Sequence, residues 1–363
     1  MHIFSVLQSR SLCLFLFGIT ASACAPDQTP THPNPALTPI DSTRLIESGS
    51  VVLGTIGTII SLDDGSYLIA DGQNYTIRHF DRNGRQIRAI GRRGHGPGEF
   101  TDFGPVAYDG DSLLFVLAGL ELHALHFPSG SFRFRAPLPA PYANSIAVDR
   151  GDLYFRSIDQ SSGPRISRWR GSQIETGAQL PRPSDQNPLL DPYLSIAVIA
   201  PLRGRDTVLV AIQSSDDVLI GSFHGPLQRF PVARLHRQGS RPDLRARLAA
   251  DLQEANKDPQ LVYTPSVPVA IARLSNGMVA YVTFDYTLVR DHFAAKAYLS
   301  VVDSRTGRSC PDARIPVPED PAPSIAIRGD TLVIASQEIA GTSAQSWLRR
   351  FLIDVRNCGW VGG

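Results

Sequence analysis

The sequence predicts an all-β fold, and two observations support this prediction. The 28 prolines and 30 glycines are spread along 363 residues, which favours many short strands joined by turns over long helices. Short apolar runs with strand character lie between these turns, most clearly from Tyr67 to Ala70 and from Tyr75 to Phe80. Hydrophobic residues make up 42% of the chain, so a sizeable core can be built.

One short pattern recurs six times: an apolar run, a turn with Gly or Asp, and a second apolar run. The six copies begin at Ile59, Val106, Ile146, Ile199, Ile271 and Ile325. Their turn glycines are 41 to 73 residues apart, and one blade of a β-propeller takes roughly 40 to 50 residues. Six copies with insertions therefore predict a six-bladed β-propeller, in which each copy is the first hairpin of a four-stranded antiparallel blade.

The last copy lacks room for a fourth strand, because the chain ends at Gly363 soon after its third strand at 347–354. At the other end of the chain, the apolar run Thr43–Ser48 has no partner in its own blade. We therefore predict that this N-terminal strand supplies the last strand of blade six and closes the ring, which hides sheet edges that would otherwise aggregate.

The stretch Tyr67–Phe100 has the most specific motif. Its strand-like runs are joined by the Asn-Gly turn at 83 and 84, a strong hairpin signal, and it ends in the glycine-rich loop GRRGHGPGEF at 91–100. It resembles an NHL-type repeat, which has an fD-x-x-G hairpin followed by a G-x-x-G-x-G-P-G-x-F loop. The resemblance implies a propeller blade, and over roughly residues 42–358 the chain is similar to exported six-bladed propeller proteins of bacteria.

Residues 1–23 have the pattern of a secretory signal peptide: Arg10, a short apolar run, and small residues at 21–23. Cys24 follows, which resembles a bacterial lipobox although Ala21 stands where leucine is usual. That resemblance implies a lipid anchor on Cys24, with ordinary signal-peptidase cleavage as the alternative. Residues 24–41 are polar and proline-rich, as in an extended tether. We expect an exported protein, anchored in the bacterial envelope at the outer membrane.

Two further features lie in the body of the chain. Cys310 and Cys358 could form a disulfide in an oxidising compartment, or remain two separate thiols because adjacent blades diverge outward. Residues about 240–258 predict a helical insertion, with leucines at 244, 248 and 252 on one face, either packing on the rim or walling the central pocket. Residues 359–363 form a C-terminal tail.

Composition and motifs restrict the function. A net charge of +1 gives no reason to expect nucleic acid as a partner, and no nucleophile elbow, phosphate-binding loop, dinucleotide fingerprint or zinc signature is present. The enlarged hairpin of blade five offers a candidate binding loop, with a solvated loop as the alternative. Its residues are Asp285, Tyr286, Arg290, Asp291 and His292.

The chain is also similar to six-bladed calcium-dependent lactonases, and that resemblance implies acidic and amide side chains around a central ion. The inner-strand cores instead read IAV, IAI and IAR, and only Glu99 and Asn144 are candidates for the channel mouth. We expect a monomeric binding module without a cofactor, presenting one face of the disc to a protein, peptide or glycan. The alternative is a calcium-dependent hydrolase or lactonase with its site in the central channel.

Overall fold

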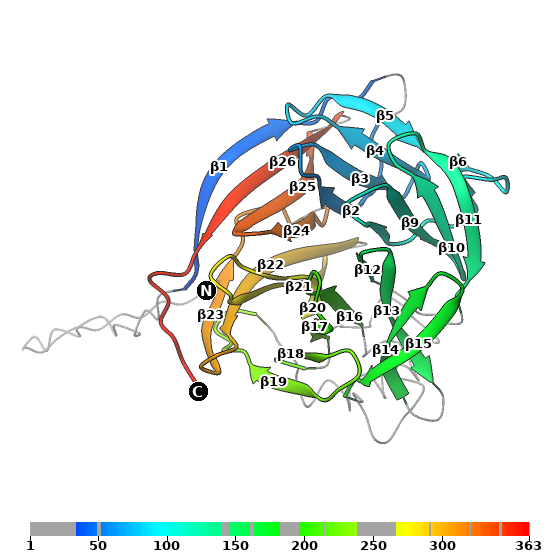
Figure 1. The fold of residues 1–363 in the computed structure, drawn as a ribbon. Coiled ribbons are helices and arrows are strands. Elements are labelled where there is room, and N and C mark those ends of the chain that lie inside the picture. The colour runs from blue at the N-terminus through cyan, green and yellow to red at the C-terminus, as the bar shows by residue number, and fades with distance from the viewer. Residues whose placement is uncertain are drawn as a thin grey trace, which may run out of the picture. The chain divides into compact units, whose positions relative to one another are not determined.

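The computed structural model describes residues 34–48, 52–138, 145–159, 163–181, 196–213, 215–237, 266–289, 292–319, 321–340 and 343–362. All of them belong to one compact unit, Pro33–Gly363. Within these residues every regular element is a β-strand, and none is a helix long and apolar enough to cross a membrane. Six four-stranded antiparallel sheets are arranged around an axis (Figure 1). The predicted six-bladed propeller is confirmed, whereas the predicted helix at 240–258 lies outside the described residues.

Each of the first five blades runs from an inner to an outer strand in chain order. Blade one is β2 (Ile56–Ser61), β3 (Tyr67–Asp71), β4 (Thr76–Phe80) and β5 (Gln86–Ile90), and blade two is β8 (Val106–Tyr108), β9 (Leu113–Ala118), β10 (Glu121–His126) and β11 (Ser131–Pro137). Blade three is β12 (Ile146–Asp149), β13 (Asp152–Asp159), β14 (Gly163–Arg170) and β15 (Gln173–Gln179), and blade four is β16 (Ala197–Pro201), β17 (Thr207–Ile212), β18 (Asp217–Ser222) and β19 (Leu227–Pro231). Blade five is β20 (Val267–Arg273), β21 (Val279–Val289), β22 (His292–Asp303) and β23 (Arg308–Arg314).

Blade six contains β24 (Ser324–Arg328), β25 (Thr331–Ala340) and β26 (Ser343–Asp354), and its outer strand is β1 (Ala36–Arg44) from the N-terminal end. The N-terminal strand therefore closes the ring as predicted, but it lies several residues earlier than Thr43–Ser48 and begins inside the stretch predicted as tether. The first part of β1 could not be recognised in the sequence, because it contains Pro39 and proline normally argues against a strand. An outer strand tolerates proline since one of its edges has no ladder partner, and the register shifts between Pro39 and Asp41.

Apolar clusters between neighbouring blades hold the ring together. In β17, Val208, Val210 and Ile212 pack toward blade three, whereas Leu209 and Ala211 pack toward blade five. Successive side chains of a strand point to opposite faces of its sheet, so a strand between two blades must be apolar at every position. This is why the second strands of the blades read as continuous hydrophobic runs.

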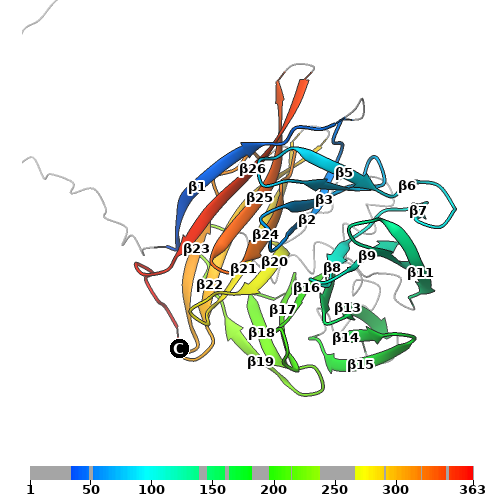
Figure 2. The ribbon, with the colours of Figure 1, turned by 45° about the horizontal axis from the view of Figure 1, so that its top comes forward.

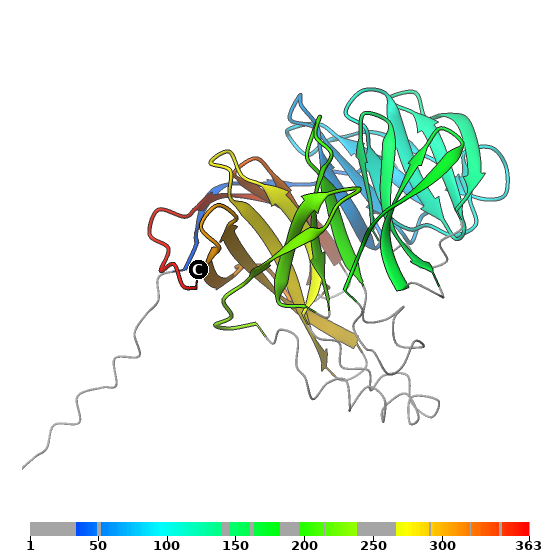
Figure 3. The ribbon, with the colours of Figure 1, turned by 60° about the horizontal axis from the view of Figure 1, so that its bottom comes forward.

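The C-terminal tail crosses from blade six to the outer strand of blade five (red in Figure 3). Ser309 and Val361 exchange two backbone hydrogen bonds of 3.0 and 2.9 Å, and the Arg308 guanidinium donates to the Trp360 carbonyl oxygen at 2.6 Å. A disulfide joins Cys310, in β23, to Cys358, immediately before the tail, with 5.5 Å between their Cα atoms. Of the two alternatives that the sequence leaves open for these cysteines, the structure has the disulfide.

The antiparallel order of every sheet gives the ring two different faces. One face carries the links between blades, the turns between second and third strands, and the N-terminal ends of the inner strands; we call it the connection face. The opposite face, the hairpin face, carries the other turns. On the connection face the β21–β22 and β25–β26 hairpins project beyond their inner strands, and Figure 2 shows β25–β26 doing so. Because Ser324 pairs with Ala335 while β25 continues to Ala340, the projection is about 16 Å at roughly 3.3 Å per residue.

Candidate functional site

A cavity of about 480 Å³ lies on the axis of the ring. Its walls come from the inner strands of all six blades and the residues just before them, together with Phe284 of β21. They are mainly isoleucine, valine, proline and alanine, and include Ile59, Val106, Ile146, Ile199, Ala270 and Ile325. No charged residue is among the described residues that line this cavity. The apolar inner-strand cores seen in the sequence therefore produce an aliphatic channel.

The polar side chains of the cavity wall are the hydroxyls of Thr58, Ser145 and Ser324. Ser145 immediately precedes β12 and Ser324 is the first residue of β24, so both lie at the connection-face end of their inner strands. The Thr58 hydroxyl already has one partner, because its Oγ1 accepts a long hydrogen bond of 3.4 Å from the Val106 N–H. The cavity thus combines an aliphatic body with uncharged hydrogen-bonding groups near the connection face.

The candidate binding loop of blade five differs from its prediction. Asp285 and Tyr286 lie in the paired strand β21, because the enlarged hairpin consists of longer strands. Asp285 is 2% exposed and accepts a hydrogen bond from the Ser266 hydroxyl. Tyr286 is partly buried against Phe284, with 5.9 Å between ring centroids, and burial raises the pKa of its phenol. Neither is an exposed loop side chain.

The remaining residues of that prediction are not placed. Arg290 and Asp291 lie outside the described residues, as do Cys24 and Asn144. His292 is the first residue of β22, and its backbone alone is described.

Glu99, the other candidate for the channel mouth, is bound within the glycine-rich loop instead. Its carboxylate accepts hydrogen bonds from the Arg92 Nε at 2.7 Å and from the Gly96 N–H at 2.9 Å. It lies in β7 (Glu99–Phe100), which pairs in parallel with β6 (Arg92–Arg93). The backbone and arginine donors lower the pKa of Glu99. Within the described ranges, no three His, Cys, Asp or Glu side chains gather closely enough to hold a metal ion.

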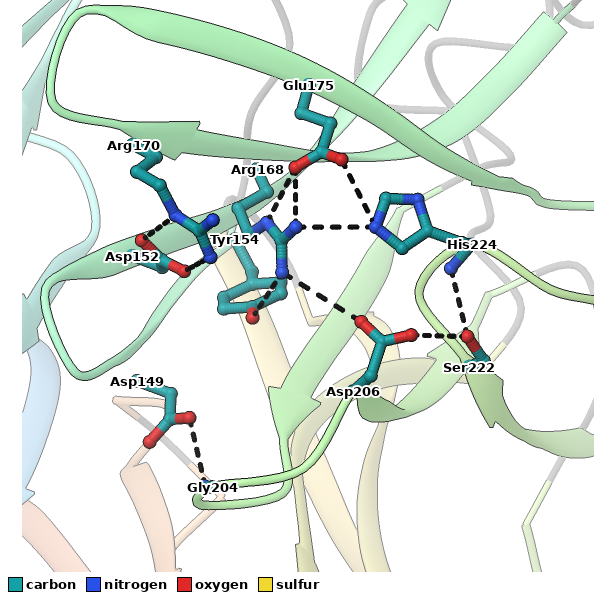
Figure 4. Close-up of polar contacts among 10 residues, drawn as sticks. All are labelled: Asp149, Asp152, Tyr154, Arg168, Arg170, Glu175, Gly204, Asp206, Ser222 and His224. Atoms are coloured by element: carbon teal, nitrogen blue, oxygen red, sulfur yellow. Dashed lines mark hydrogen bonds and ion pairs between the residues drawn. The ribbon is translucent and has the colours of Figure 1, made fainter.

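A polar network that the sequence did not reveal joins blades three and four on the hairpin face (Figure 4). Its centre is Arg168 of β14, which is 8% exposed. The guanidinium donates to Glu175 at 3.0 Å and to the Tyr154 hydroxyl at 3.4 Å, and lies 3.9 Å from Asp206 of blade four. It also lies over the Phe223 ring, 4.4 Å from the centroid. One buried arginine therefore connects carboxylates of two blades.

The rest of this network does not form a nucleophile–base pair. The Ser222 hydroxyl donates to Asp206 at 2.5 Å, while the His224 ring lies 3.1 Å from Glu175. The contact between Ser222 and His224 is made by the backbone N–H of His224, not by its ring. A serine activated by histidine needs the ring nitrogen on the hydroxyl. The arrangement is therefore that of an ionic seam between blades.

The comparisons with known proteins agree with this fold. Residues 45–179 match a family model, DUF5128, described as a 6-bladed beta-propeller. No curated protein matches the chain in sequence.

Solved structures resemble the chain over most of its length at low identity. A Bacteroides fragilis protein is 13% identical with a TM-score of 0.58, over 89% of this chain and 96% of that one. A member of the duf4221 family from Bacteroides vulgatus is 10% identical with a TM-score of 0.61, over 89% and 99%. The WD40 repeats of RRP9 are 12% identical with a TM-score of 0.53, over 88% and 100%. At these identities the likeness concerns the fold alone.

Proposed function

We propose that this chain is an exported, lipid-anchored propeller of the NHL-like kind that binds a protein, peptide or glycan partner in the bacterial envelope through its connection face. The observation that carries this proposal is the aliphatic axial cavity of about 480 Å³, lined by all six blades. Ligand pockets are typically concave, mostly apolar and about 300 to 1,000 Å³ in volume, with a few polar groups that fix orientation.

The two long hairpins support the connection face as the binding face. They rise from the adjacent blades five and six, so they form a wall on one side of the axis. Ile339, near the end of β25, is 67% exposed there. Its exposure makes position 339 accessible to a partner that approaches this face.

The proposed anchor is Cys24, with the following residues as a tether to β1, whose first residue is Ala36. An extended chain of that length would keep the propeller within about 40 Å of the lipid surface, at roughly 3.3 to 3.6 Å per residue. Attachment through an outer strand of blade six leaves both faces of the ring free for a partner.

The second function, a calcium-dependent hydrolase or lactonase, would need carboxylates or amides directed at the axis. The described wall offers aliphatic groups and hydroxyls there, and the Glu99 carboxylate is held by Arg92 and Gly96. This donor set supports binding over calcium-dependent catalysis.

Site-specific photo-crosslinking in cells tests the proposal. A photoreactive residue at Ile339 reports on the connection face, and one at Ile174, 38% exposed beside a turn of the hairpin face, is the matched control. We expect a discrete adduct from position 339 and none from position 174. Equal labelling at both positions, or no adduct at 339, would refute the assignment of the binding face.

A further inference from the structure

Positive charge gathers on the outer edge of blades one and two. Residues 82–98 contain five arginines and residues 122–138 contain two, and neither stretch contains Asp or Glu. Six of these arginines have exposed side chains on β5, β6 or β11 or just before β5, and we call them the basic rim: Arg85, Arg88, Arg92, Arg93, Arg133 and Arg135. A chain with a net charge of +1 therefore carries a local excess of positive charge.

The strands that carry the basic rim belong to one continuous surface at the edge of the ring (Figure 1). A Cβ added to Gly130, in the β10–β11 turn, would lie 3.1 Å from Ile90 at the end of β5. The Arg88 guanidinium donates to the Pro128 carbonyl oxygen in the same turn. Since β6 follows β5 directly, the arginines of blade one, of the glycine-rich loop and of blade two lie on the same edge.

The alternation of side chains turns arginines of both outer strands toward the gap between blades one and two. Arg88 shares a face of β5 with Ile90, which packs in the apolar cluster between these blades. Arg135 alternates in β11 with Phe134, which packs toward blade three, so the arginine points the other way, toward blade one. Arg133 is the extra residue of a bulge in β11, and its side chain is exposed.

Most of the basic rim has no counter-charge. The Arg92 guanidinium is 2.6 Å from Glu99, and that of Arg135 is 3.8 Å from Glu121. The other four contact no carboxylate within the part of the chain that the structure describes: Arg85, Arg88, Arg93 and Arg133. Exposed arginines near the ends of β14 and β26, in contrast, pair with aspartates. The basic rim is therefore open to an anionic partner.

The chemistry of this surface suits phospholipid headgroups. Guanidinium groups bind phosphate through paired N–H donors, and each basic side chain near an anionic membrane strengthens attachment. Two isoleucines lie beside Arg85: Ile87 is 50% exposed, and Ile46, which forms a β-bridge with Arg85, is 51% exposed. Basic side chains next to exposed aliphatic ones are typical of protein surfaces that lie on a membrane.

The start of the chain favours a membrane over a soluble anion. β1 is the outer strand of blade six, and the chain continues from it to Ile46, which meets blade one at Arg85. Ala36, the first residue of β1, comes 12 residues after Cys24, the proposed anchor. The tether would hold blade one close to the lipid surface, and at such a high effective concentration individually weak contacts suffice.

We propose that the basic rim binds the anionic phospholipid headgroups of the membrane that carries the anchor. The disc then stands with its edge on the membrane, and both of its faces remain accessible. This contact goes beyond the partner binding proposed above, and it rests on the proposed anchor only for the choice of a membrane as the anionic partner.

Vesicle flotation tests the proposal with residues 25–363, which contain the whole compact unit from Pro33 and lack the cysteine that would carry lipid. The vesicles consist of phosphatidylcholine alone, or of phosphatidylcholine with about 30% phosphatidylglycerol, which is anionic. We expect binding at least tenfold tighter to the mixed vesicles, and a loss of binding as salt is raised from about 0.1 to 0.5 M, because salt screens the charges. Equal binding to both kinds of vesicle would overturn the proposal.

Variants assign the binding to the basic rim. Arg85→Gln combined with Arg133→Gln should weaken binding to the mixed vesicles about 25-fold, which is about fivefold for each arginine. Arg203→Gln combined with Arg205→Gln is the matched control, since it removes the same charge from exposed residues of the β16–β17 turn in blade four. The control should stay within twofold of the unmodified chain. Equal losses in the two double variants would show that net charge alone matters, and the proposal would be wrong.

An environment-sensitive fluorophore tests the place of contact. Attached at Ile87→Cys it should brighten and shift to the blue on the mixed vesicles, whereas at Ile174→Cys, on the outer strand of blade three, it should not respond. The same response at both positions would contradict contact through the basic rim, and so would binding of soluble polyglutamate in preference to the vesicles. These measurements involve neither lipid on Cys24 nor a partner, so they can fail while lipidation and crosslinking at Ile339 are observed, and the reverse.

Discussion

Removing the disulfide should destabilise the ring by an amount that can be worked out from its place in the chain. Cys310 and Cys358 are 48 residues apart, and their bond ties the tail to the outer strand of blade five. In the chain-entropy model, a closed loop of that length restricts the unfolded chain by about 4 kcal/mol at 25 °C. Native domains are stable by only about 5 to 15 kcal/mol, so this is a large share of the total.

The assay is urea unfolding of the full chain followed by circular dichroism, with and without a reductant, for the wild type and Cys358→Ser. We expect the free energy of unfolding of the oxidised wild type to exceed that of the variant by up to about 4 kcal/mol. The reduced wild type should match the variant, and the variant should not respond to the reductant. A difference below about 1 kcal/mol would refute the reasoning from loop closure.

Three other predictions follow from single features. Burial lowers the pKa of His79, whose ring contacts the Ser66 hydroxyl at 2.9 Å. The unfolded chain therefore binds the His79 proton more tightly than the folded protein does. The contribution of His79 to stability is complete above the ordinary pKa of about 6.5 and falls as the pH is lowered through that value. The melting temperature should therefore drop more between pH 7.5 and 5.5 in the wild type than in His79→Gln, and parallel pH profiles would contradict this. Gly91→Ala should lower the free energy of unfolding in urea by at least about 2 kcal/mol, because φ is +82° and the new Cβ would lie 2.3 Å from the Phe100 ring. The control Gly110→Ala, at φ +84° with nothing within 4 Å of the new Cβ, should lower it by about 1 to 2 kcal/mol. Equal losses in the two variants would show that the Phe100 contact is unimportant. Calcium should neither appear in stoichiometric amount in native mass spectrometry nor raise the melting temperature, and a calcium-dependent rise would restore the hydrolase alternative.

The number of blades could be predicted because the signal for it is local. Each of the six turn glycines that set the repeat has a positive φ in the structure, from +54° at Gly329 to +86° at Gly277. L-residues with a side chain rarely adopt this conformation, so a glycine there marks a turn whatever surrounds it. The apolar runs on either side mark the strands that the turn joins.

Several buried side chains could not be predicted because their partners are distant in sequence. Asp216 looks like a residue of a solvated turn, yet it pairs at 2.6 Å with the buried guanidinium of Arg237. Asp312 is fully buried and accepts backbone N–H bonds from 235, 236 and 237, on the chain segment that leaves blade four. Nothing near Asp312 in sequence indicates that a loop some 75 residues earlier packs on it.

The candidate site could likewise be predicted only in part from the sequence. The aliphatic inner strands predict an apolar axis, but the cavity exists only because six such strands, separated by most of the chain, meet around it. In the same way, nothing in the sequence marks Gln213, just after β17, or Thr283, within β21, and the docking of blade four on blade five is what buries them; their side chains have no hydrogen-bond partner among the described residues.

The sequence by itself determined the strands, the turns, the number of blades and their order, since these depend on a two-residue alternation and on backbone conformations that neighbouring residues fix. The tertiary structure alone decided the position of the closing strand, the docking of the tail by the disulfide, the ionic seam at Arg168 and the axial cavity. Each of these joins segments that are far apart in the sequence, and its energy depends on which side chains the closed ring brings face to face.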